Sequence, residues 1–310
     1  MKLLVLHYDA PYIKEKLENK FPNVTILAAT AEDQIGDFIE SADILVCNRA
    51  SDELIKRGEK LQWVHCFITG TNYLLSLPSF PKHIIFTSTR GIHGPQMSEM
   101  AFLHMLNLTR NYARMLRNQD KGVWERWPQP LLYNKAVGIL GVGAIGKEIA
   151  RKAKAFDMTV HGIVSAKREI EFVDHCYGPE GLMEVLQTVD YFINNIPATP
   201  ETINLMGEKE FSNMKSSAYY INIGRGDTED QEALIRALES KRIAGAALDV
   251  FRTEPLPENN PLWQMENVLI TPHVGGMSDI YADQALPILE ENLGRFLKGE
   301  RRDLLNFIDL

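Results

Sequence analysis

Cysteine is scarce in this chain. Only three cysteines occur among 310 residues, and no two of them form a Cys-x-x-Cys pair; they are Cys47, Cys66 and Cys176. An odd number of scattered cysteines argues against a disulfide-stabilised secreted domain and against a zinc site built from paired cysteines. We therefore expect a reducing compartment, with the cytoplasm as the default, and no bound metal.

Positive charge and long apolar runs are also in short supply. Lysine and arginine number 33 against 41 aspartates and glutamates, which gives a formal net charge of -8. This balance provides no general attraction to nucleic acid or to an anionic membrane, so any phosphate must be bound locally. The apolar run that follows Lys2 ends at His7, too short for the core of a signal peptide or for a membrane span. We expect small-molecule partners, with no nucleic acid and no membrane.

What the chain does contain is a series of apolar segments that alternate with amphipathic ones. A hydrophobic content of 45% and a charged content of 24% are typical of a globular enzyme. In the N-terminal part the pattern predicts strands and helices in alternation, and strands separated in this way pair in parallel. The strands are expected at residues 2–8, 23–29, 43–48, 63–67 and 83–88, and the helices at residues 12–20, 31–40 and 51–60.

A long helical pattern spans residues 95–119, and a second alternating series begins at Lys135. Its strands are expected at residues 135–140, 158–164, 172–177, 190–196, 218–224, 243–250 and 267–273, with a final helix at residues 278–299. The sequence therefore predicts an α/β fold of two Rossmann-like or flavodoxin-like lobes with parallel sheets and a cleft between them. We expect the substrate-binding lobe at residues 1–96 and 277–310, and the dinucleotide-binding lobe at residues 97–276.

A glycine-rich loop opens the second series. Residues 136–150 read AVGILGVGAIGKEIA, so a predicted strand runs directly into Gly141, Gly143 and Gly146 and a helix follows. In that context the glycines permit a tight turn and a close approach to a pyrophosphate, which the amides of Ala144 and Ile145 would bind at the helix N-terminus. The alternative is an ordinary glycine-rich turn between a strand and a helix.

The next strand lacks a feature that NAD-binding sites usually have. An acidic side chain at its end normally accepts hydrogen bonds from the ribose of NAD. This chain reads GIVSAKRE there and offers Ser165, Lys167 and Arg168 instead. A hydroxyl and two cations suit the 2′-phosphate of NADP(H). We therefore expect NADP(H) to be preferred over NAD(H). The alternative is that both cations are solvated and that NAD(H) is used.

Three polar residues follow other predicted strands of the same series. Arg225 lies in INIGRGD, Glu254 in DVFRTEPLP and His273 in TPHVGG. The carboxyl ends of parallel strands meet at one edge of a sheet, where open α/β folds bind ligands. Arginine can hold a carboxylate in a bidentate manner, and a His–Glu pair can exchange a proton near neutral pH. Each residue alone could be structural, but together they indicate a catalytic group.

With these segments in view, the chain resembles the D-isomer-specific 2-hydroxyacid dehydrogenase family over essentially its whole length. The matching motifs are LGVGAIG, NNIPATPET, INIGRGD, AALDVFRTEPLP and TPHVGG, in family order. The resemblance implies that Arg225, Glu254 and His273 are catalytic, with Arg225 and His273 also touching the substrate. It further implies substrate contacts from Ile68, Thr69 and Gly70. Cofactor contacts would come from Gly141, Gly143, Ala144, Ile145, Gly146, Ser165, Lys167, Arg168, Ile196, Pro197, Thr202, Ile223, Asp249, Gly275 and Gly276.

Two positions depart from the family pattern. Met97 stands where many relatives have a small hydroxyl residue near the nicotinamide, and Glu229 replaces a usually apolar residue just before Asp230. The pattern gives no account of Glu229. No further domain is expected after residue 310, which disfavours the longer, amino-acid-regulated phosphoglycerate dehydrogenases.

The function that the resemblance implies is hydride transfer between a nicotinamide and C2 of a small 2-oxo or 2-hydroxy acid. The expected direction is reduction of an oxo acid with D-specificity, as in a glyoxylate or hydroxypyruvate reductase. One alternative is a dehydrogenase of another small anion, such as formate or phosphite. Another is a non-catalytic protein of the same fold that senses dinucleotides. We expect a homodimer, with VWERWPQPLLY at residues 123–133 either in the interface or packed on its own subunit.

Overall fold

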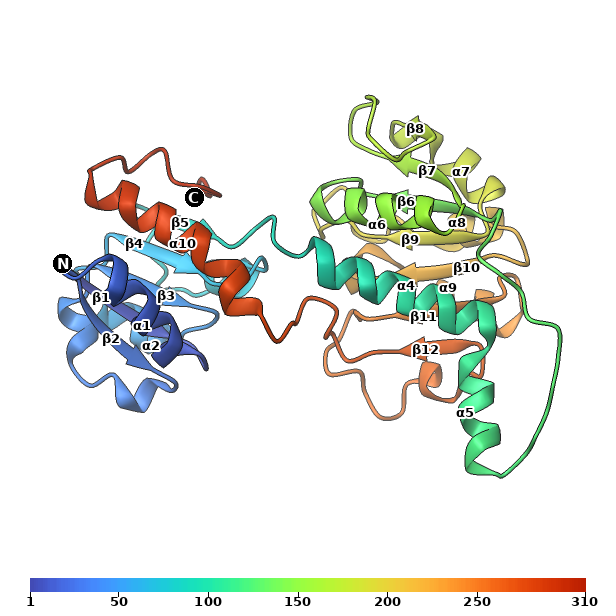
Figure 1. Ribbon diagram of the computed structural model, residues 1–310, viewed down its shortest axis with the longest axis horizontal. Coiled ribbons are helices and arrows are strands. Elements are labelled where there is room, and N and C mark those ends of the chain that lie inside the picture. The colour runs from blue at the N-terminus through green and yellow to red at the C-terminus, as the bar shows by residue number, and fades with distance from the viewer. The chain divides into compact units, whose positions relative to one another are not determined.

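The computed structural model describes residues 1–310, and the chain folds into two compact units (Figure 1). The first unit comprises Met1–Ile92 and Ser278–Leu310, and the second comprises His93–Met277. The boundaries differ from those expected by a few residues, because helix α4 already begins at Gly94 and carries residues 94–96 into the second unit. The chain has no helix that is both long enough and apolar enough to cross a membrane.

The sheet of the first unit has five parallel strands in the order β2-β1-β3-β4-β5. All five strands form where the apolar runs predicted them, and their registers are parallel throughout. The central strands are buried on both faces, as parallel strands covered by helices are. Their bounds are β1 Lys2–Leu6, β2 Thr25–Ala29, β3 Ile44–Cys47, β4 Trp63–Cys66 and β5 Ile85–Ser88.

Four α-helices flank this sheet. They are α1 Ala10–Lys20, α2 Asp52–Arg57, α3 Asn72–Leu75 and α10 Tyr281–Leu297. The helix expected at residues 31–40 was wrong. Two short 3₁₀ turns, Glu32–Gln34 and Phe38–Ser41, replace it, because Gly36 has a φ of 55° that no α-helix accommodates.

The sheet of the second unit has seven parallel strands in the order β12-β11-β10-β9-β6-β7-β8. All seven were predicted from the sequence. Strands β7 and β8 follow β6 on one side, and strands β9 to β12 follow on its other side. The strand order therefore reverses between β6 and β9. Ligands bind at such a switch point, beyond the carboxyl ends of the strands. The strands are β6 Ala136–Leu140, β7 Thr159–Ile163, β8 His175–Tyr177, β9 Tyr191–Asn194, β10 Tyr219–Asn222, β11 Gly245–Leu248 and β12 Val268–Ile270.

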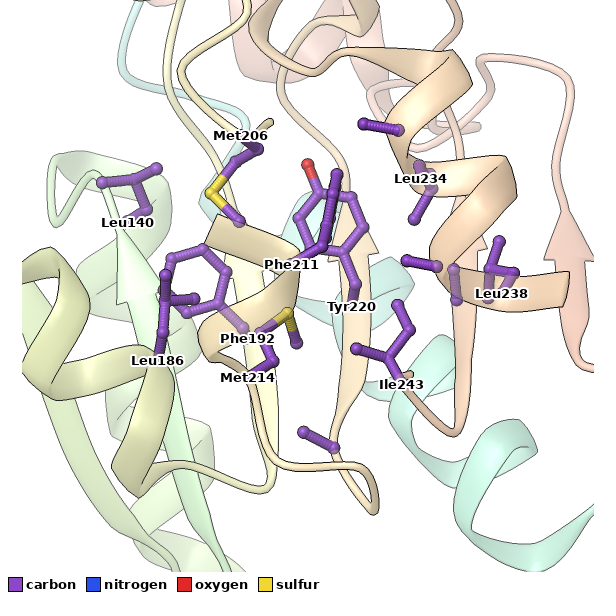
Figure 2. Close-up of a cluster of buried hydrophobic side chains, with 14 of the residues drawn as sticks. Leu140, Leu186, Phe192, Met206, Phe211, Met214, Tyr220, Leu234, Leu238 and Ile243 are labelled. Carbon is purple, nitrogen blue, oxygen red and sulfur yellow. The ribbon is translucent and has the colours of Figure 1, made fainter. Parts of the chain in front are cut away.

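Helices cover both faces of this sheet. Figure 2 shows one face, where Phe192 and Tyr220 of the sheet pack against Phe211 of α8, against Met214 directly after that helix and against Leu234 of α9. The other face packs against α4 and α6. The α-helices are α4 Gly94–Arg110, α5 Tyr112–Asp120, α6 Ala144–Ala155, α7 Leu182–Thr188, α8 Glu208–Asn213 and α9 Gln231–Glu239, and 3₁₀ turns lie at Pro179–Gly181, Gly226–Thr228 and Pro261–Gln264.

The single helix expected at residues 95–119 is two helices. Asn111 lies between α4 and α5 with a φ of 50°, in the left-handed region that asparagine tolerates better than most residues. The fold class itself is confirmed: the protein is an α/β protein with two parallel sheets. The cleft between the lobes stays a prediction.

Candidate active site

The glycine-rich loop lies at the switch point of the larger sheet. It joins β6 to α6, and the amide of Gly141 donates to the carbonyl of Ile163 at the end of β7. Gly141 has a φ of 94°, and a Cβ there would lie 2.7 Å from the backbone oxygen of Asn195. A Cβ on Gly146 would lie 2.4 Å from the oxygen of Gly141. These glycines therefore let the loop fold tightly between the two neighbouring strands and the helix.

The N-terminus of α6 is open to a ligand. No side chain caps it, and the amides of Ala144 and Ile145 have no intrahelical acceptors. No atom lies within 4 Å of a Cβ built on Gly143, so the backbone there is accessible. Uncapped amides at the positive end of a helix fit the pyrophosphate of a dinucleotide. These residues could hold a nicotinamide cofactor.

The segment after β7 borders this loop. Ser165, Lys167 and Arg168 are exposed, and neither cation makes an ion pair within the chain. The only hydrogen bond of the Arg168 side chain is a long one of 3.4 Å from Nη1 to the carbonyl of Ala166. No acidic side chain stands at position 165 to repel a 2′-phosphate.

The segment after β9 faces the glycine loop from the other side. Asn195 donates from Nδ2 to the carbonyl of Gly141 at 3.3 Å, and Ile196 and Pro197 follow it. The hydroxyl of Thr202 donates to the carbonyl of Pro197 at 2.7 Å, so this side chain closes its own turn. Ile223 is only 2% exposed and packs in the core, which leaves its backbone for any cofactor contact.

Asp249, at the end of β11, holds the segment that carries His273. Its Oδ1 accepts from the Thr271 hydroxyl at 2.6 Å and from the Val274 amide at 3.1 Å, while Oδ2 accepts from the Gly275 amide at 2.9 Å. The carboxylate is buried and fully engaged in these bonds. It therefore fixes the backbone on both sides of His273.

His273 and Glu254 form a hydrogen-bonded pair. Nδ1 of His273 lies 2.7 Å from Oε2 of Glu254, and Oε1 of Glu254 accepts from the Phe251 amide at 3.0 Å. Because Nδ1 faces a carboxylate, it carries a proton, and Nε2 is left for a reacting group. Both side chains are partly exposed, so a substrate can reach them.

Arg225 follows β10 in a turn that packs closely on the segment leading to Glu254. A Cβ on Gly226 would lie 2.0 Å from the carbonyl carbon of Phe251, so only glycine allows this contact. Arg225 is half-buried and makes no ion pair within the chain. Its Nη1 donates to the carbonyl of Gly224 at 2.6 Å. A guanidinium that has no acidic partner within the chain is suited to bind an anion.

Two further residues, His93 and Met97, lie near this region. The sequence did not single out His93, and it singled out Met97 without giving it a role. Burial and the Arg225 charge lower the pKa of His93, which lies directly before α4. A Cβ on Gly276 would lie 3.6 Å from Cδ2 of His93 and 3.9 Å from Sδ of Met97. The sequence signal for His93 was weak, since a histidine before a helix is commonly structural.

The residues expected to bind the substrate from the first unit form a loop after β4. The hydroxyl of Thr69 donates to the carbonyl of Thr89 at 3.0 Å, and the carbonyl of Ile68 accepts from the Thr89 amide at 3.4 Å. Gly70 accepts a weak bond from the Cys66 thiol. The loop is thus attached to the end of β5, and its role in binding stays a prediction. No group of three or more His, Cys, Asp or Glu side chains is arranged to hold a metal ion.

The fold and this site define a class of protein: a two-unit α/β protein with a dinucleotide-binding loop beside an Arg, Glu and His group. The sequence profile of the D-isomer specific 2-hydroxyacid dehydrogenase NAD binding domain matches residues 102–275. The chain belongs to the D-isomer specific 2-hydroxyacid dehydrogenase family, and the resemblance found in its motifs is confirmed.

Relatives of known structure support this assignment along the whole chain. A family protein from Aeromonas salmonicida is 32% identical, with a TM-score of 0.91 over 99% of this chain and 98% of its own. An NADPH-dependent glyoxylate/hydroxypyruvate reductase from Sinorhizobium meliloti, in complex with NADP and sulfate, is 27% identical, with a TM-score of 0.85 over 99% and 98% of the two chains.

A longer relative is also similar. The D-3-phosphoglycerate dehydrogenase of Methanocaldococcus jannaschii is 29% identical in an alignment of 315 positions that includes 97% of this chain. The match spans 58% of that enzyme's own length.

Proposed function

We propose that this protein reduces a small 2-oxo acid to the D-2-hydroxy acid with NADPH, as a glyoxylate or hydroxypyruvate reductase does. The observation that carries the proposal is the 2.7 Å pair of His273 and Glu254 at the same sheet edge as the unpaired Arg225. An acid and an anion-binding group are what reduction of an oxo acid requires from the protein.

His273 is the proton donor in this proposal. When bound, the cofactor supplies a hydride to C2 of the substrate, and negative charge develops on the carbonyl oxygen. His273 donates the Nε2 proton to that oxygen, since Nδ1 is already held by Glu254. Glu254 is itself fixed by the Phe251 amide, so it holds the imidazole in the orientation that presents Nε2 to the substrate.

Arg225 is the substrate clamp. Its planar guanidinium binds the carboxylate and stabilises charge on the adjacent carbonyl as the hydride arrives. The half-buried position of Arg225 strengthens this interaction, because the surroundings screen charge less than bulk water does. The backbone amides of residues 68–70 are the second group that we assign to the substrate carboxylate.

NADPH is the cofactor that this proposal favours over NADH. Ser165 removes the repulsion that an aspartate would exert on a 2′-phosphate, and the unpaired Lys167 and Arg168 supply positive charge. The reductase from Sinorhizobium meliloti is NADPH-dependent and has this overall fold, which supports the same choice here.

The alternatives fit the site less well. Oxidation of formate or phosphite produces no alkoxide that must be protonated, so it gives the His273–Glu254 pair no acid to supply. A protein that only senses dinucleotides needs neither this pair nor an unpaired Arg225. Both alternatives remain outcomes of the test.

The test is turnover with a panel of anions. Glyoxylate, hydroxypyruvate and pyruvate should be reduced with NADPH, while formate and phosphite should not be oxidised. Arg225→Lys keeps the charge but loses the planar fork, so the KM for the oxo acid should rise about tenfold and kcat should fall. Turnover of a neutral aldehyde as fast as the oxo acid would contradict the clamp.

We also propose a homodimer whose interface includes residues 123–133. Trp124 is 92% exposed, and Val123, Leu131 and Tyr133 are at least 50% exposed, so a large part of their apolar surface is open to solvent. Exposed aromatic and aliphatic side chains in one segment are typical of an interface. Analytical ultracentrifugation should give a dimer for the native protein and a monomer for Trp124→Glu with Leu131→Asp. A native monomer at micromolar concentration would exclude this interface.

A further inference from the structure

Glu229 is a buried acid next to the Arg225 turn. It follows the 3₁₀ turn Gly226–Thr228 and is 1% exposed, and its side chain makes no ion pair. A buried carboxyl without a paired cation costs stability unless hydrogen bonds compensate for lost water. An apolar residue would avoid that cost, so the acid has to be explained by what it contacts.

Its carboxylate accepts from Asn222 at the end of β10. Nδ2 of Asn222 donates to Oε2 of Glu229 at 2.8 Å and also to the carbonyl of Arg225 at 3.2 Å. Oδ1 of the same asparagine accepts from the Gly224 amide at 3.0 Å. The Asn222 side chain therefore hydrogen-bonds to Gly224, to Arg225 and to Glu229. The bond to the Glu229 carboxylate holds this amide side chain in place.

A second layer of polar groups supports the first. Thr228 donates from its hydroxyl to the carbonyl of Arg225 at 2.6 Å, and Nδ2 of Asn194 donates to that hydroxyl at 2.8 Å and to the Tyr220 hydroxyl at 2.9 Å. The Tyr220 hydroxyl is in turn hydrogen-bonded to Glu229. The carbonyl of Arg225 therefore accepts two hydrogen bonds, from Asn222 and from Thr228. Asn222 belongs to β10, and Thr228 is held by Asn194 of β9 in the same seven-stranded sheet.

One charged side chain, Arg252, and two neutral polar side chains, Tyr220 and Asn222, act on the Glu229 carboxyl. Burial raises the pKa of Glu229 to about 7, against the hydrogen bonds from Tyr220 on β10 and Asn222 and the positive charge of Arg252 after β11. Arg252 also donates from Nη2 to the Glu229 carbonyl at 3.0 Å. Near neutral pH the Glu229 side chain is therefore present in both its charged and its protonated form, and either form can accept the hydrogen bond from Asn222.

We propose that Glu229 is a positioning residue: through Asn222 it fixes the turn that presents Arg225 to the substrate carboxylate. The inference rests on the proposed role of Arg225. It assigns a function to the residue at which this chain departs from the apolar pattern of its family. Glu229 itself touches neither substrate nor cofactor in this account.

Two variants of Glu229 test the proposal. In Glu229→Val, Asn222 loses one of its two acceptors, so the KM for glyoxylate should rise about tenfold, as loss of one or two hydrogen bonds on the turn predicts. The kcat should fall by less, and the Kd for NADPH should not change. Glu229→Gln keeps a neutral acceptor, so its KM should match the native value at pH 6, where Glu229 is mostly protonated. At pH 8 the KM of this variant should be several-fold above native, because the native acceptor is then charged.

A matched control separates positioning from general destabilisation. Leu238 is buried in the same core but outside this network. Leu238→Ala should lower the Tm while leaving the KM for glyoxylate unchanged. A native KM in Glu229→Val would overturn the inference, as would parallel losses of kcat, KM and NADPH affinity in both Glu229→Val and Leu238→Ala. Arg225→Lys keeps the two proposals apart: if it leaves the KM unchanged, the clamp itself is wrong, whatever Glu229 does.

Discussion

His273 occupies a backbone conformation that few residues other than glycine adopt. Its φ is 53°, and its amide donates to the carbonyl of Thr271 two residues before it at 3.0 Å. Strain of this kind persists only where the surroundings hold it, and here Asp249 binds the neighbouring amides of Val274 and Gly275. The imidazole is therefore aimed by the backbone as well as by Glu254. A side chain held in this way is pre-organised to donate a proton at one position.

Replacing His273 tests this role directly. His273→Ala should lower kcat for oxo acid reduction by roughly a hundredfold or more, the range that a general acid contributes. Its Kd for NADPH, measured by quenching of tryptophan fluorescence, should stay close to native because no cofactor contact is assigned to the imidazole. His83→Ala is the matched control, since His83 is an exposed histidine of the first unit. Near-native kcat in His273→Ala would remove the residue from the mechanism.

At the scale of single elements, we expect the end of β7 to decide between NADPH and NADH. Ser165→Asp should repel the 2′-phosphate, and Arg168→Ala should remove one cation that can bind it. A charge-assisted hydrogen bond contributes about 1.5–3 kcal/mol, so one engaged cation gives roughly a ten- to hundredfold preference for NADPH. The measurement is kcat/KM with NADPH and with NADH for the native protein and both variants.

The native protein should favour NADPH, and both variants should lose most of that preference. Glu169→Ala provides the control, because it alters the charge of the same exposed segment without removing a cation or adding an acid at position 165. Equal use of both cofactors by the native protein would show that the segment does not bind the phosphate.

The elements also show where a pattern of apolar residues is sufficient and where it is not. All twelve strands were predictable, because β-branched and aliphatic runs such as ILVC at Ile44–Cys47 leave few alternatives inside a sheet. Helical spacing was less reliable. Gly36 and Asn111 each adopt a left-handed φ inside a segment whose apolar spacing indicated one helix. Single-residue backbone preferences interrupt a helix without altering its periodic pattern.

The site was predictable to a similar extent. The glycines and the Arg225, Glu254 and His273 group follow from motifs at strand ends, because a parallel sheet brings those ends together. The bonds that hold the group did not follow from the motifs. The cofactor contact expected of Asp249 stays a prediction, and the motifs gave no sign that its carboxylate also binds the backbone amides that follow His273. The partners of a buried polar group depend on side-chain directions that sequence spacing leaves open.

At the scale of the whole molecule, stability should depend on the pH through the buried histidines. Burial lowers the pKa of His65 to about 3, and of His7 and His104 to about 4, from an ordinary value of 6.5. Unfolding restores the ordinary value, so below pH 6.5 the unfolded chain binds protons that the folded chain does not. Their contribution to stability is present above pH 6.5 and is lost as the pH falls. Glu229 acts in the opposite sense, because its raised pKa favours the folded state as the pH falls from about 7 toward 4.5.

His65 is the histidine on which this dependence can be measured most directly. It is fully buried on β4, where Nδ1 lies 2.8 Å from the hydroxyl of Thr87 and Nε2 lies 3.1 Å from that of Thr89. Because folded His65 stays neutral, it should lower the free energy of unfolding by about 2 kcal/mol at pH 5 relative to pH 7. His65→Gln should be less stable than native at pH 7, because it loses ring contacts and a hydrogen bond, but it should lose about 2 kcal/mol less on acidification to pH 5. Urea unfolding at both pH values measures the difference, with the exposed His83→Gln as a control whose pH dependence should match the native protein. An equal loss in native and His65→Gln would mean that His65 does not stay neutral in the folded state.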